Sequence, residues 1–563
     1  MTDLKQGLRV AIVGLGPRGL GAVEALILRA REAGLHLQVD AFDTVDHPGA
    51  GPNFSPDQTD CCLLNTPARA LDIAPDPALG KRVPVFDAPD TDANDADHFP
   101  TRAALGSYLA DRLSQVRALN SDVLSLNIRK RTVSDVEQRA DGLWLETDGA
   151  WIGPYADVLL TLGQPQTRPD DQLAAWIDHV AAGHGALRAA YPDRALLEAA
   201  QGWAGQTVAI RGLGLSTMDV LRVLTTGLGG EFTASGYRRS GREPARILPF
   251  SLNGQPPAPK PVSQAVDQLF DLSDRELASI IDALCSGMQQ GPDGALMTFC
   301  AGLAPPVVRI LDEVGSPATA ADVDRWLATE QTDPGGQATL PPLQTLQHTI
   351  AMAEGRSPAD VGFTVGQVMR KLENAIRKAF NPETVLPQTA KALVGFNEGL
   401  SRYSYGPPLR SARELLMLVE AGVVSFVEAE DPDIEMVDGG WLLRDGSEQR
   451  RATVMVDAVL PPPDLDRVTE PLFEALRRKG WITPVAEGLG AQTAADGGLI
   501  AARGQGVTNL CLLGRMALGS VIAVDSIHDC FGAATHRWAD GVMQRHATGG
   551  GQAPQGLGNN PPE

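Results

Sequence analysis

Val10-Ala-Ile-Val-Gly14-Leu-Gly16-Pro-Arg-Gly19-Leu is the stretch that decides the fold of this chain. It follows the apolar run Leu8 to Val13, which has the length of a strand, and it opens the stretch Gly19 to Ala33, whose periodicity predicts a helix. Gly14 permits a tight turn, Gly16 lets the backbone approach a pyrophosphate, and Gly19 lets the helix lie close to the strand. The N-terminus of that helix is therefore predicted to bind the phosphates of a dinucleotide.

An acidic residue supports this interpretation. The predicted second strand, Leu37 to Asp43, ends in a carboxylate roughly 20 residues after the last glycine of the turn, where the ribose of a bound dinucleotide would donate hydrogen bonds. Asp43 is therefore the candidate ribose ligand. The alternative is the glycine-rich turn of an ordinary α/β domain that binds nothing.

A second glycine-rich turn follows at Val208-Ala-Ile-Arg-Gly212-Leu-Gly214-Leu-Ser216-Thr217. Thr207 to Arg211 is predicted to be its strand, and Thr217 to Gly227 its helix. Thr217 occupies the third glycine position, so we expect this helix to lie slightly farther from its strand. Two such turns favour a flavoprotein that binds FAD in one domain and accepts hydride from a nicotinamide bound in another.

A basic segment follows the second turn. Arg238, Arg239 and Arg242 occur where the adenosine ribose of the nicotinamide nucleotide is expected. Arginine side chains there could bind a 2′-phosphate through paired hydrogen bonds, which favours NADPH over NADH. The alternative is a solvated basic loop on an acidic protein.

The composition is that of a large globular protein. At 563 residues the chain exceeds the usual size of a single core, so two or three domains are expected, and its hydrophobic content of 43% is ordinary. The formal net charge of -21 argues against a nucleic-acid partner, whose phosphates would be repelled. We find no uninterrupted apolar stretch of membrane-spanning length and no signal peptide before the first strand, which predicts a cytoplasmic protein.

The six cysteines, at positions 61, 62, 285, 300, 511 and 530, form no Cys-x-x-Cys pair. This spacing argues against the disulfide reductases among two-dinucleotide flavoenzymes, which need two nearby thiols to relay electrons. Cys61 and Cys62 are adjacent, which rarely allows a useful disulfide geometry, and are therefore interpreted as reduced core thiols. The nine histidines show no ligand-like spacing, so no metal site is predicted.

The order of elements predicts an α/β fold with two Rossmann-like dinucleotide-binding domains and a helical insertion. Alternating runs between residues 132 and 152 predict an antiparallel meander. Because the strand before Gly514 can rejoin the sheet begun at Leu8, Gly163 and Gly514 are candidate cofactor contacts, unless they only end their strands. The first part of the FAD-binding domain is predicted at 1–165 and the NADPH-binding domain at 200–260. The helical insertion is predicted at 261–425, with helices at 273–288, 344–354, 366–380 and 411–421. The chain is then expected to return to the FAD-binding domain at 426–546 and to end in a disordered tail at 547–563.

Motifs spread over nearly the whole chain carry a family resemblance. They are Gly14-x-Gly-Pro17-Arg18-Gly19, Gly49-Ala-Gly-Pro with Leu63-Leu-Asn65-Thr, Phe99-Pro-Thr-Arg102, Ser240-Gly-Arg-Glu-Pro244, Tyr405-Gly-Pro-Pro-Leu-Arg410, and Leu513-Gly-Arg515 with Val524-Asp525-Ser. In combination they resemble the bacterial FAD/NAD(P)-binding flavoproteins related to the N-hydroxylating monooxygenases. That family includes aspartate N-monooxygenases, which use FAD, NADPH and oxygen to oxidise the amine of L-aspartate to nitrosuccinate.

The resemblance implies the cofactors FAD and NADPH, and oxygen with a small amine or amino acid as reactants. Two departures from the family pattern, Thr161-Leu-Gly163 and Met516-Ala-Leu-Gly519, lie near the expected flavin and substrate region and leave the substrate open. The resemblance implies FAD contacts at Gly14, Gly16, Pro17, Arg18, Gly19, Asp43, Asn65, Gly163, Gly514 and Arg515, and NADPH contacts at Gly212, Gly214, Ser216, Arg238, Arg239 and Arg242.

A carboxylate-bearing substrate would need a cationic clamp, preferably of arginine, whose fork matches a carboxylate. Arg69, Arg102, Arg410 and Arg515 are candidates, because each lies beside a family-like motif. No catalytic side chain is assigned, since the protein is expected to position the reactants and to exclude water. Two alternatives stay open: a non-oxygenating NAD(P)H-dependent flavin oxidoreductase, and a binding module that holds FAD without turnover. The sequence does not decide the oligomeric state.

Overall fold

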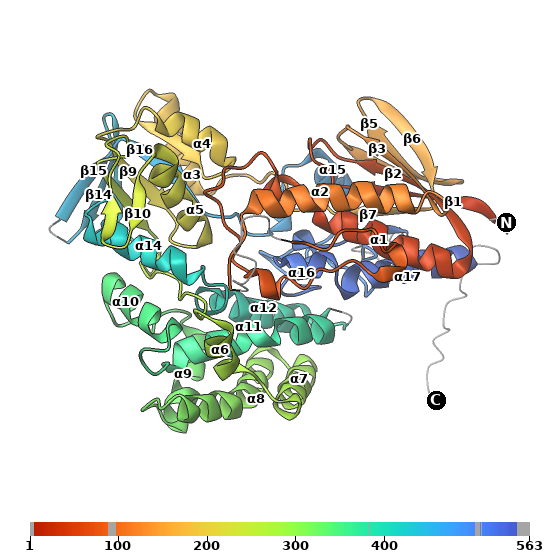
Figure 1. Cartoon of the computed structure of the whole chain (residues 1–563). Coiled ribbons are helices and arrows are strands. Elements are labelled where there is room, and N and C mark those ends of the chain that lie inside the picture. Colours follow the sequence, from red (N-terminus) through yellow and green to blue (C-terminus); the bar gives the residue numbers. More distant parts are fainter. Residues whose placement is uncertain are drawn as a thin grey trace, which may run out of the picture.

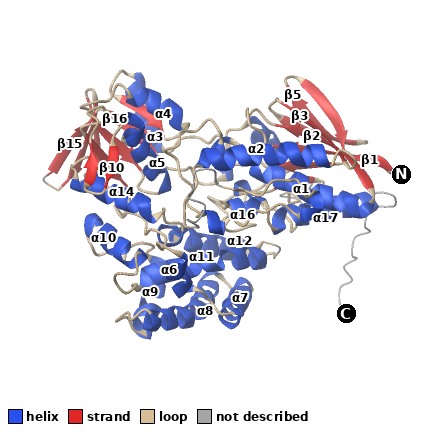
Figure 2. Ribbon diagram, viewed as in Figure 1, coloured by secondary structure: helices blue, strands red, loops and turns tan. Residues whose placement is uncertain are grey.

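The structure is a computed structural model that describes residues 5–87, 97–381, 383–446, 448–501, 507 and 509–548. Two α/β units lie side by side, and a helical region lies against both of them (Figure 1). The strands gather in the two units, whereas the third region is built from helices (Figure 2). The predicted tail, 547–563, lies outside the described residues from position 549 onward.

The first unit is built on a parallel sheet with the strand order β17-β7-β1-β2-β3. Leu512 of the last strand pairs with Leu160, so the strand before Gly514 joins the sheet begun by the N-terminal strand, as predicted. The strands β7 and β17 are buried along their whole length, whereas β3 alternates buried and exposed residues. The strands are β1 (Lys5–Val13), β2 (Leu35–Phe42), β3 (Leu124–Arg129), β7 (Asp157–Leu160) and β17 (Leu510–Leu512), and the helices are α1 (Pro17–Ala33), α2 (Arg102–Leu119), α16 (Ile527–Cys530) and α17 (Ala533–Thr548).

The predicted antiparallel meander is confirmed between β3 and β7. It consists of β4 (Asp135–Arg139), β5 (Gly142–Thr147) and β6 (Ala150–Tyr155), and α15 (Pro471–Arg478) packs against it. Tyr155 donates a hydrogen bond of 2.8 Å to Asp40 on β2, and Arg9 on β1 donates another of 2.8 Å to the same carboxylate. The buried bond of Tyr155 fixes the meander to the parallel sheet.

The second unit is built on a parallel sheet with the strand order β12-β9-β16-β8. Its β9 matches the predicted strand Thr207 to Arg211, and α5 begins two residues before the predicted helix. The strands are β8 (Ala186–Ala189), β9 (Thr207–Arg211), β12 (Arg246–Phe250) and β16 (Val454–Asp457), and the helices are α3 (Asp171–Ala181), α4 (Asp193–Ala200) and α5 (Leu215–Leu224). The two parallel sheets confirm the predicted α/β fold with two Rossmann-like units.

The organisation after residue 426 differs from the prediction. We expected 426–546 to return to the first unit, but β16 lies beside β9 in the second sheet, whereas α15 packs against β4 and β17 pairs with β7 in the first unit. The small sheet of β13 (Asp433–Val437), β14 (Gly440–Asp445) and β15 (Glu448–Ala452) also packs on the second unit. A short apolar strand fits either parallel sheet equally well, so its sequence pattern does not distinguish them.

The helical region contains the four predicted helices and others that the pattern did not indicate. By length and composition alone α8 could cross a membrane, with a mean hydropathy of 1.5 over its most apolar window, but it packs against α7, α9 and α12. Pro305 and Pro306 lie inside α8 and hide it from a pattern-based prediction, because proline normally interrupts a helix. The helices are α6 (Gln264–Asp267), α7 (Asp274–Met288), α8 (Pro292–Glu313), α9 (Ala320–Thr332), α10 (Pro342–Ala353), α11 (Val361–Phe380), α12 (Pro387–Gly399), α13 (Ser401–Ser404) and α14 (Leu409–Glu420).

Candidate functional site

The first glycine-rich turn has the close backbone packing that its sequence predicts. Gly14 has a φ of +96°, and its N–H donates to the Phe42 carbonyl at 2.8 Å. A Cβ at Gly19 would lie 2.4 Å from the Gly14 carbonyl oxygen, so a side chain there would force the helix away from the strand. Within the described part of the chain no side chain caps the first turn of α1, which leaves its N–H groups free to bind phosphate.

A second glycine loop packs against this turn. The Gly49 N–H donates to the Leu15 carbonyl at 2.6 Å, and a Cβ at Gly51 would lie 3.3 Å from the Gly16 Cα. The two glycine loops therefore pack backbone against backbone at the N-terminus of α1. Asp43 lies at the same edge, where its carboxylate accepts a hydrogen bond of 2.5 Å from the Leu15 N–H.

Arg18 has a structural partner. Its guanidinium lies 2.6 Å from the Asp529 carboxylate and also donates to the Val524 carbonyl at 3.1 Å. Burial would lower the pKa of Arg18, but the Asp529 carboxylate outweighs it and raises this pKa above its ordinary value. Arg18 thus holds the C-terminal segment against α1, and Pro17 forms the first residue of that helix.

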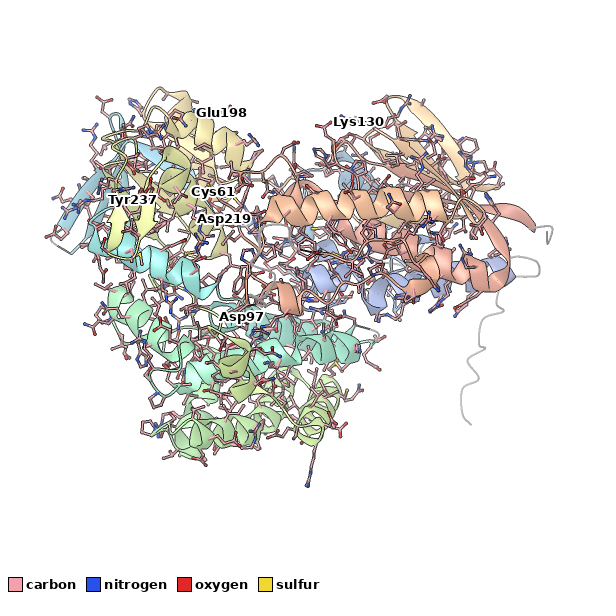
Figure 3. All side chains as sticks on the ribbon, viewed as in Figure 1. Cys61, Asp97, Lys130, Glu198, Asp219 and Tyr237 are labelled. Carbon is pink, nitrogen blue, oxygen red and sulfur yellow. The ribbon has the colours of Figure 1, made fainter. Side chains whose placement is uncertain are left out.

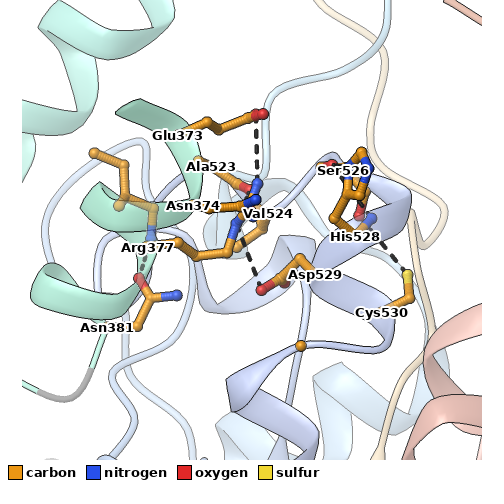
Figure 4. Close-up of polar contacts among 12 residues, drawn as sticks. Glu373, Asn374, Arg377, Asn381, Ala523, Val524, Ser526, His528, Asp529 and Cys530 are labelled. Atoms are coloured by element: carbon orange, nitrogen blue, oxygen red, sulfur yellow. Dashed lines mark hydrogen bonds and ion pairs between the residues drawn. The ribbon is translucent and has the colours of Figure 1, made fainter. Parts of the chain in front are cut away.

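The same C-terminal segment is held from the other side by the helical region. Arg377 of α11 donates to the Ala523 carbonyl at 3.0 Å and lies 3.7 Å from Asp529 (Figure 4). Asn381 accepts a hydrogen bond of 2.8 Å from the Ile522 N–H. His528 lies 2.7 Å from the Ala70 carbonyl, in the loop that contains Asn65. This segment therefore connects α1, α11 and the Asn65 loop.

The carboxyl ends of the two sheets converge at Arg515. Its guanidinium donates to Gln164, after β7, at 2.6 Å and to the Pro461 carbonyl, after β16, at 2.9 Å. It also forms an ion pair with Asp525. Gly514 has a φ of +97° and Gly163 a φ of +67°, and a Cβ at Gly163 would have no heavy atom of the described residues within 4 Å. Ligands of open α/β sheets bind outside the carboxyl ends of the strands, so this junction is the candidate site of the reaction.

The second turn repeats the first with one substitution. The Gly212 N–H donates to the Phe250 carbonyl at 2.8 Å, as the Gly14 N–H does to the Phe42 carbonyl. At the third glycine position the buried Thr217 hydroxyl donates to the Gly212 carbonyl at 2.8 Å. Helix α5 begins after Gly214, with Ser216 in its first turn and no side-chain cap from the described residues.

The structure does not bring the three predicted phosphate-binding arginines to this turn. Arg246, the first residue of β12, pairs with Thr207, the first residue of β9, so Arg238, Arg239 and Arg242 precede the amino ends of the strands. Gly212 follows the carboxyl end of β9, at the opposite edge of the sheet. Arg238 forms an exposed ion pair with Glu231, and Arg239 donates to the Gly422 carbonyl at 3.2 Å. The expectation that this group lies beside the ribose is therefore corrected.

The candidate clamp residues are also dispersed. Arg102 at the start of α2 forms an ion pair of 2.9 Å with Asp219 of α5, between the two units. Arg410 is on the surface of α14, where its side chain is 72% exposed and pairs with Glu414 at 2.8 Å. Arg69 lines a cavity, where it donates to Asp97 at 2.6 Å.

The cavity around Arg69 contains residues that sequence reasoning missed. It has a free volume of about 20 Å³, about the room of one water molecule, and lies where the first unit meets the helical region, at the level of Asp97 (Figure 3). Lys260 and Arg370 line it together with Arg69 and Asp267. Burial, and secondarily the charge of Arg370, lowers the pKa of Lys260 to about 7. The one hint in the sequence is the position of this lysine between two prolines, Pro259 and Pro261.

Cys61 and Cys62 are free thiols, as the sequence predicts. Cys62 is buried, and burial, followed by the charge of Asp219, raises the pKa of its thiol above the ordinary value. Among the described residues no three or more histidine, cysteine or acidic side chains are grouped so that they could hold a metal ion.

Two parallel-sheet units, each with a glycine-rich turn opening a helix, define a protein of the two-dinucleotide-binding class. Residues 11–165 match the family model described as FAD-NAD(P)-binding. The chain is 25% identical over 545 residues to a nitrosuccinic acid synthase of Aspergillus oryzae, covering 84% of this chain and 82% of that protein. It is 26% identical over 566 residues to the nitrosuccinate-forming L-aspartate N-monooxygenase of Streptomyces cremeus, covering 84% and 83%.

The fold also matches a solved structure. The reduced form of ornithine hydroxylase from Pseudomonas aeruginosa superposes on this chain with a TM-score of 0.51 at 12% sequence identity. The match covers 96% of this chain and 100% of that one. At that identity the match concerns the fold alone. The relatedness to nitrosuccinate-forming aspartate N-monooxygenases, which the motifs implied, is confirmed over most of the chain.

Proposed function

We propose that this protein is a flavin-dependent monooxygenase that uses FAD, a reduced nicotinamide nucleotide and oxygen to oxidise the amine of a small amino acid. NADPH is the first candidate for the nucleotide, and L-aspartate, giving nitrosuccinate, is the first candidate for the substrate. The observation that carries the proposal is the likeness to two nitrosuccinate-forming proteins over 84% of the chain, together with two phosphate-binding turns that face one junction.

The residues of the first turn fit FAD. A Cβ at Gly19 or at Gly14 would lie 2.4 or 2.5 Å from a backbone oxygen, so both positions require glycine. The uncapped N–H groups at the start of α1 suit a pyrophosphate. Gly14, Gly16 and Gly19 would hold the pyrophosphate, and Asp43 the ribose. When bound there, FAD would supply the chemistry that passes electrons from the nicotinamide to oxygen.

The second turn fits the nicotinamide nucleotide in the same way. Gly212, Gly214 and the first-turn residue Ser216 would hold its pyrophosphate at the N-terminus of α5. The role of the protein beyond binding is to orient the reactants and to exclude water at the junction. Arg515 serves that role, because it ties the loops after β7 and β16 together with a side chain only 13% exposed.

We also propose a cytoplasmic location. The formal net charge of -21 suits a freely dissolved protein, and α8 is packed among other helices.

The test is NADPH consumption by the FAD-loaded protein in air, with and without L-aspartate, while hydrogen peroxide is counted. We expect L-aspartate to accelerate NADPH oxidation, to lower peroxide below one per NADPH, and to yield nitrosuccinate. Succinate, which has the same two carboxylates and no amine, is the matched control and gives no oxygenated product. Rapid NADPH oxidation with no oxygenated product from any amine tested would identify a flavin reductase instead. If NADPH leaves the flavin oxidised in the absence of air, the protein binds FAD without turnover.

A further inference from the structure

The topology of the second unit indicates where the adenosine end of its nucleotide lies. The nicotinamide must reach the flavin at the junction, and the junction adjoins the end of β16, where Arg515 donates to the Pro461 carbonyl at 2.9 Å. In the sheet, β16 is one neighbour of β9 and β12 is the other. A pyrophosphate bound at the Gly212 turn, which follows β9, therefore directs the adenosine ribose to the carboxyl end of β12.

An irregular edge segment, residues 423–431, extends this sheet beside β12. Parallel bridges join Ile247 to Val424 at one end of the segment and Ser251 to Glu430 at the other. Because the segment runs in the same direction as β12, both end at the same edge of the sheet. The edge segment thus brings Glu430 to the position of the adenosine ribose.

Glu430 lies against the loop that follows β12. A Cβ at Gly254 would lie 2.8 Å from both the Cα and the Cβ of Glu430, so the side chain of Glu430 starts at this loop. Glu430 and the next residue, Asp431, are both exposed. Within the described part of the chain neither carboxylate has an ion-pair or hydrogen-bond partner. Both are therefore available to accept hydrogen bonds from a ligand.

The segments that meet beside Glu430 contain no arginine, lysine or histidine. They are residues 251–259 after β12, the edge segment, and residues 331–341 of the helical region. The last of these is held to the β12 loop by Gln255, which donates to the Leu340 carbonyl at 3.0 Å. A 2′-phosphate at this position would find no cation in any of the three segments.

A cation outside these segments is already compensated. Arg450 of β15 lies 3.4 Å from Glu428 in the edge segment and 3.1 Å from Glu448, so it serves two carboxylates. A phosphate with a charge of about −2 beside Glu430 would be repelled. A ribose hydroxyl at the same place would donate a hydrogen bond to the carboxylate.

An exposed leucine supports this position for the adenosine. Leu252 directly follows Ser251 at the end of β12, and it is 85% exposed. An adenine ring beside the ribose would cover its apolar surface, as ligand sites commonly pair apolar contacts with a few polar groups.

We propose that Glu430 accepts hydrogen bonds from the adenosine ribose, and that the protein therefore uses NADH as well as NADPH and binds NADH at least as tightly. The inference rests on the proposed function, because it takes the second turn to bind a reduced nicotinamide nucleotide. It concerns recognition alone, and no bond is made or broken.

The first measurement is of binding and needs neither oxygen nor an amine. NAD⁺ and NADP⁺ are titrated separately into the FAD-loaded protein by calorimetry. We expect the dissociation constant of NAD⁺ to be equal to that of NADP⁺ or lower. A lower constant for NADP⁺ would overturn the inference, and so would the failure of both nucleotides to bind.

The second measurement compares two variants that remove the same charge. Glu430→Gln alters the proposed ribose ligand, whereas Glu420→Gln alters an exposed residue at the end of α14, before the edge segment begins at the opposite edge of the sheet. We expect Glu430→Gln to weaken NAD⁺ binding about tenfold, through the loss of a charge-assisted hydrogen bond, and to strengthen NADP⁺ binding about threefold, through the loss of repulsion. Glu420→Gln should change the ratio of the two constants less than about twofold. An unchanged ratio in Glu430→Gln would overturn the inference.

The outcomes separate this inference from the proposed function. Binding of both nucleotides as expected, in a protein that oxidises no amine, supports the role of Glu430 and refutes the monooxygenase. Oxidation of L-aspartate by a protein that binds NADP⁺ more tightly than NAD⁺ supports the monooxygenase and refutes the role of Glu430. Bound FAD should be equal in both variants and in the unaltered protein, which shows that the variants are folded.

Discussion

Arg102 and Asp219 join the two α/β units through an ion pair of 2.9 Å. Arg102 opens α2 of the first unit, and Asp219 is a buried residue of α5, the helix of the second glycine-rich turn (Figure 3). Tyr191 also donates to the Asp219 carboxylate at 2.5 Å, and Arg102 lies over the Tyr191 ring. A sequence motif that suggested substrate binding thus holds the helix of the second glycine-rich turn against the first unit.

Breaking this pair from one side should destabilise the protein. Asp219→Asn leaves the guanidinium of Arg102 without a carboxylate at a largely buried position, which costs about 3 kcal/mol. We expect the melting temperature to fall by about 2 to 3 °C, since the unfolding entropy of a chain of 563 residues is large, and KM for NADPH to rise. The double variant Arg102→Met/Asp219→Leu removes both charges and should melt at a higher temperature than Asp219→Asn. Equal melting temperatures for Asp219→Asn and the unaltered protein would show that the pair contributes nothing.

The close approach in the first turn predicts a sharp effect of one methyl group. In Gly19→Ala the new Cβ would lie 2.4 Å from the Gly14 carbonyl oxygen, so α1 must move away and the phosphate site opens. We expect FAD affinity to fall at least about tenfold, measured by the flavin retained after gel filtration. Gly395→Ala on α12 is the matched control, because no heavy atom of the described residues lies within 4 Å of its added Cβ. If the Gly19→Ala protein keeps its flavin, FAD does not bind at this turn.

The helical region offers a pH-dependent contact. Burial would raise the pKa of Glu276, but hydrogen bonds from Arg309 and Ser273 outweigh it and lower this pKa from 4.5 to about 2. Because the folded-state pKa is depressed, the stabilisation is complete above 4.5 and is lost as the pH falls through about 2. Glu276→Gln should therefore lower stability at neutral pH by up to about 1 kcal/mol, with a difference that shrinks as the pH falls from about 4.5 to 2. Melting curves across this range test it, with the exposed Asp274→Asn as control.

The parts of the fold that the sequence predicts are the local ones. Strand, glycine turn and helix are contiguous in each unit, so residues 8–33 and 207–224 contain the whole pattern, and the meander is equally local. The prediction fails where a strand pairs with another strand that is far away in the sequence. Val454–Asp457 could extend either parallel sheet, and its pairing with β9 depends on tertiary packing.

The site predicted at Arg238, Arg239 and Arg242 was misplaced because the parallel strand next to β9 was wrongly predicted. The segment after α5 was expected to supply the next parallel strand, but residues 231–238 form a hairpin of β10 (Glu231–Thr233) and β11 (Gly236–Arg238). The true parallel neighbour of β9 begins at Arg246, so the arginines fall before it instead of after it. Lys260 escaped notice for a related reason: its surroundings come from segments around residues 69, 267, 370 and 406, which the fold alone brings together.

The hydrogen bond of Thr217 leads us to expect that the second turn can be altered without a change in FAD binding. Its hydroxyl donates to the Gly212 carbonyl at 2.8 Å, at the position where Gly19 meets the Gly14 carbonyl in the first turn. Thr217→Val keeps the shape and removes the donor, so the Gly212 carbonyl loses its buried partner, at a cost of about 1 to 3 kcal/mol. We expect KM for NADPH to rise about threefold to tenfold while the bound FAD stays unchanged.

Thr217→Ser is the matched control for that variant. It retains the hydroxyl and loses only the methyl group, so it should resemble the unaltered protein in KM for NADPH. Steady-state kinetics with NADPH as the varied reactant, and flavin content from the absorption spectrum, provide the two measurements. If Thr217→Ser is impaired and Thr217→Val is not, the packing of the methyl group, and not the hydrogen bond, is what positions α5 on its strand. If both variants lose FAD, the second turn supports the first unit and does not bind the nicotinamide nucleotide independently.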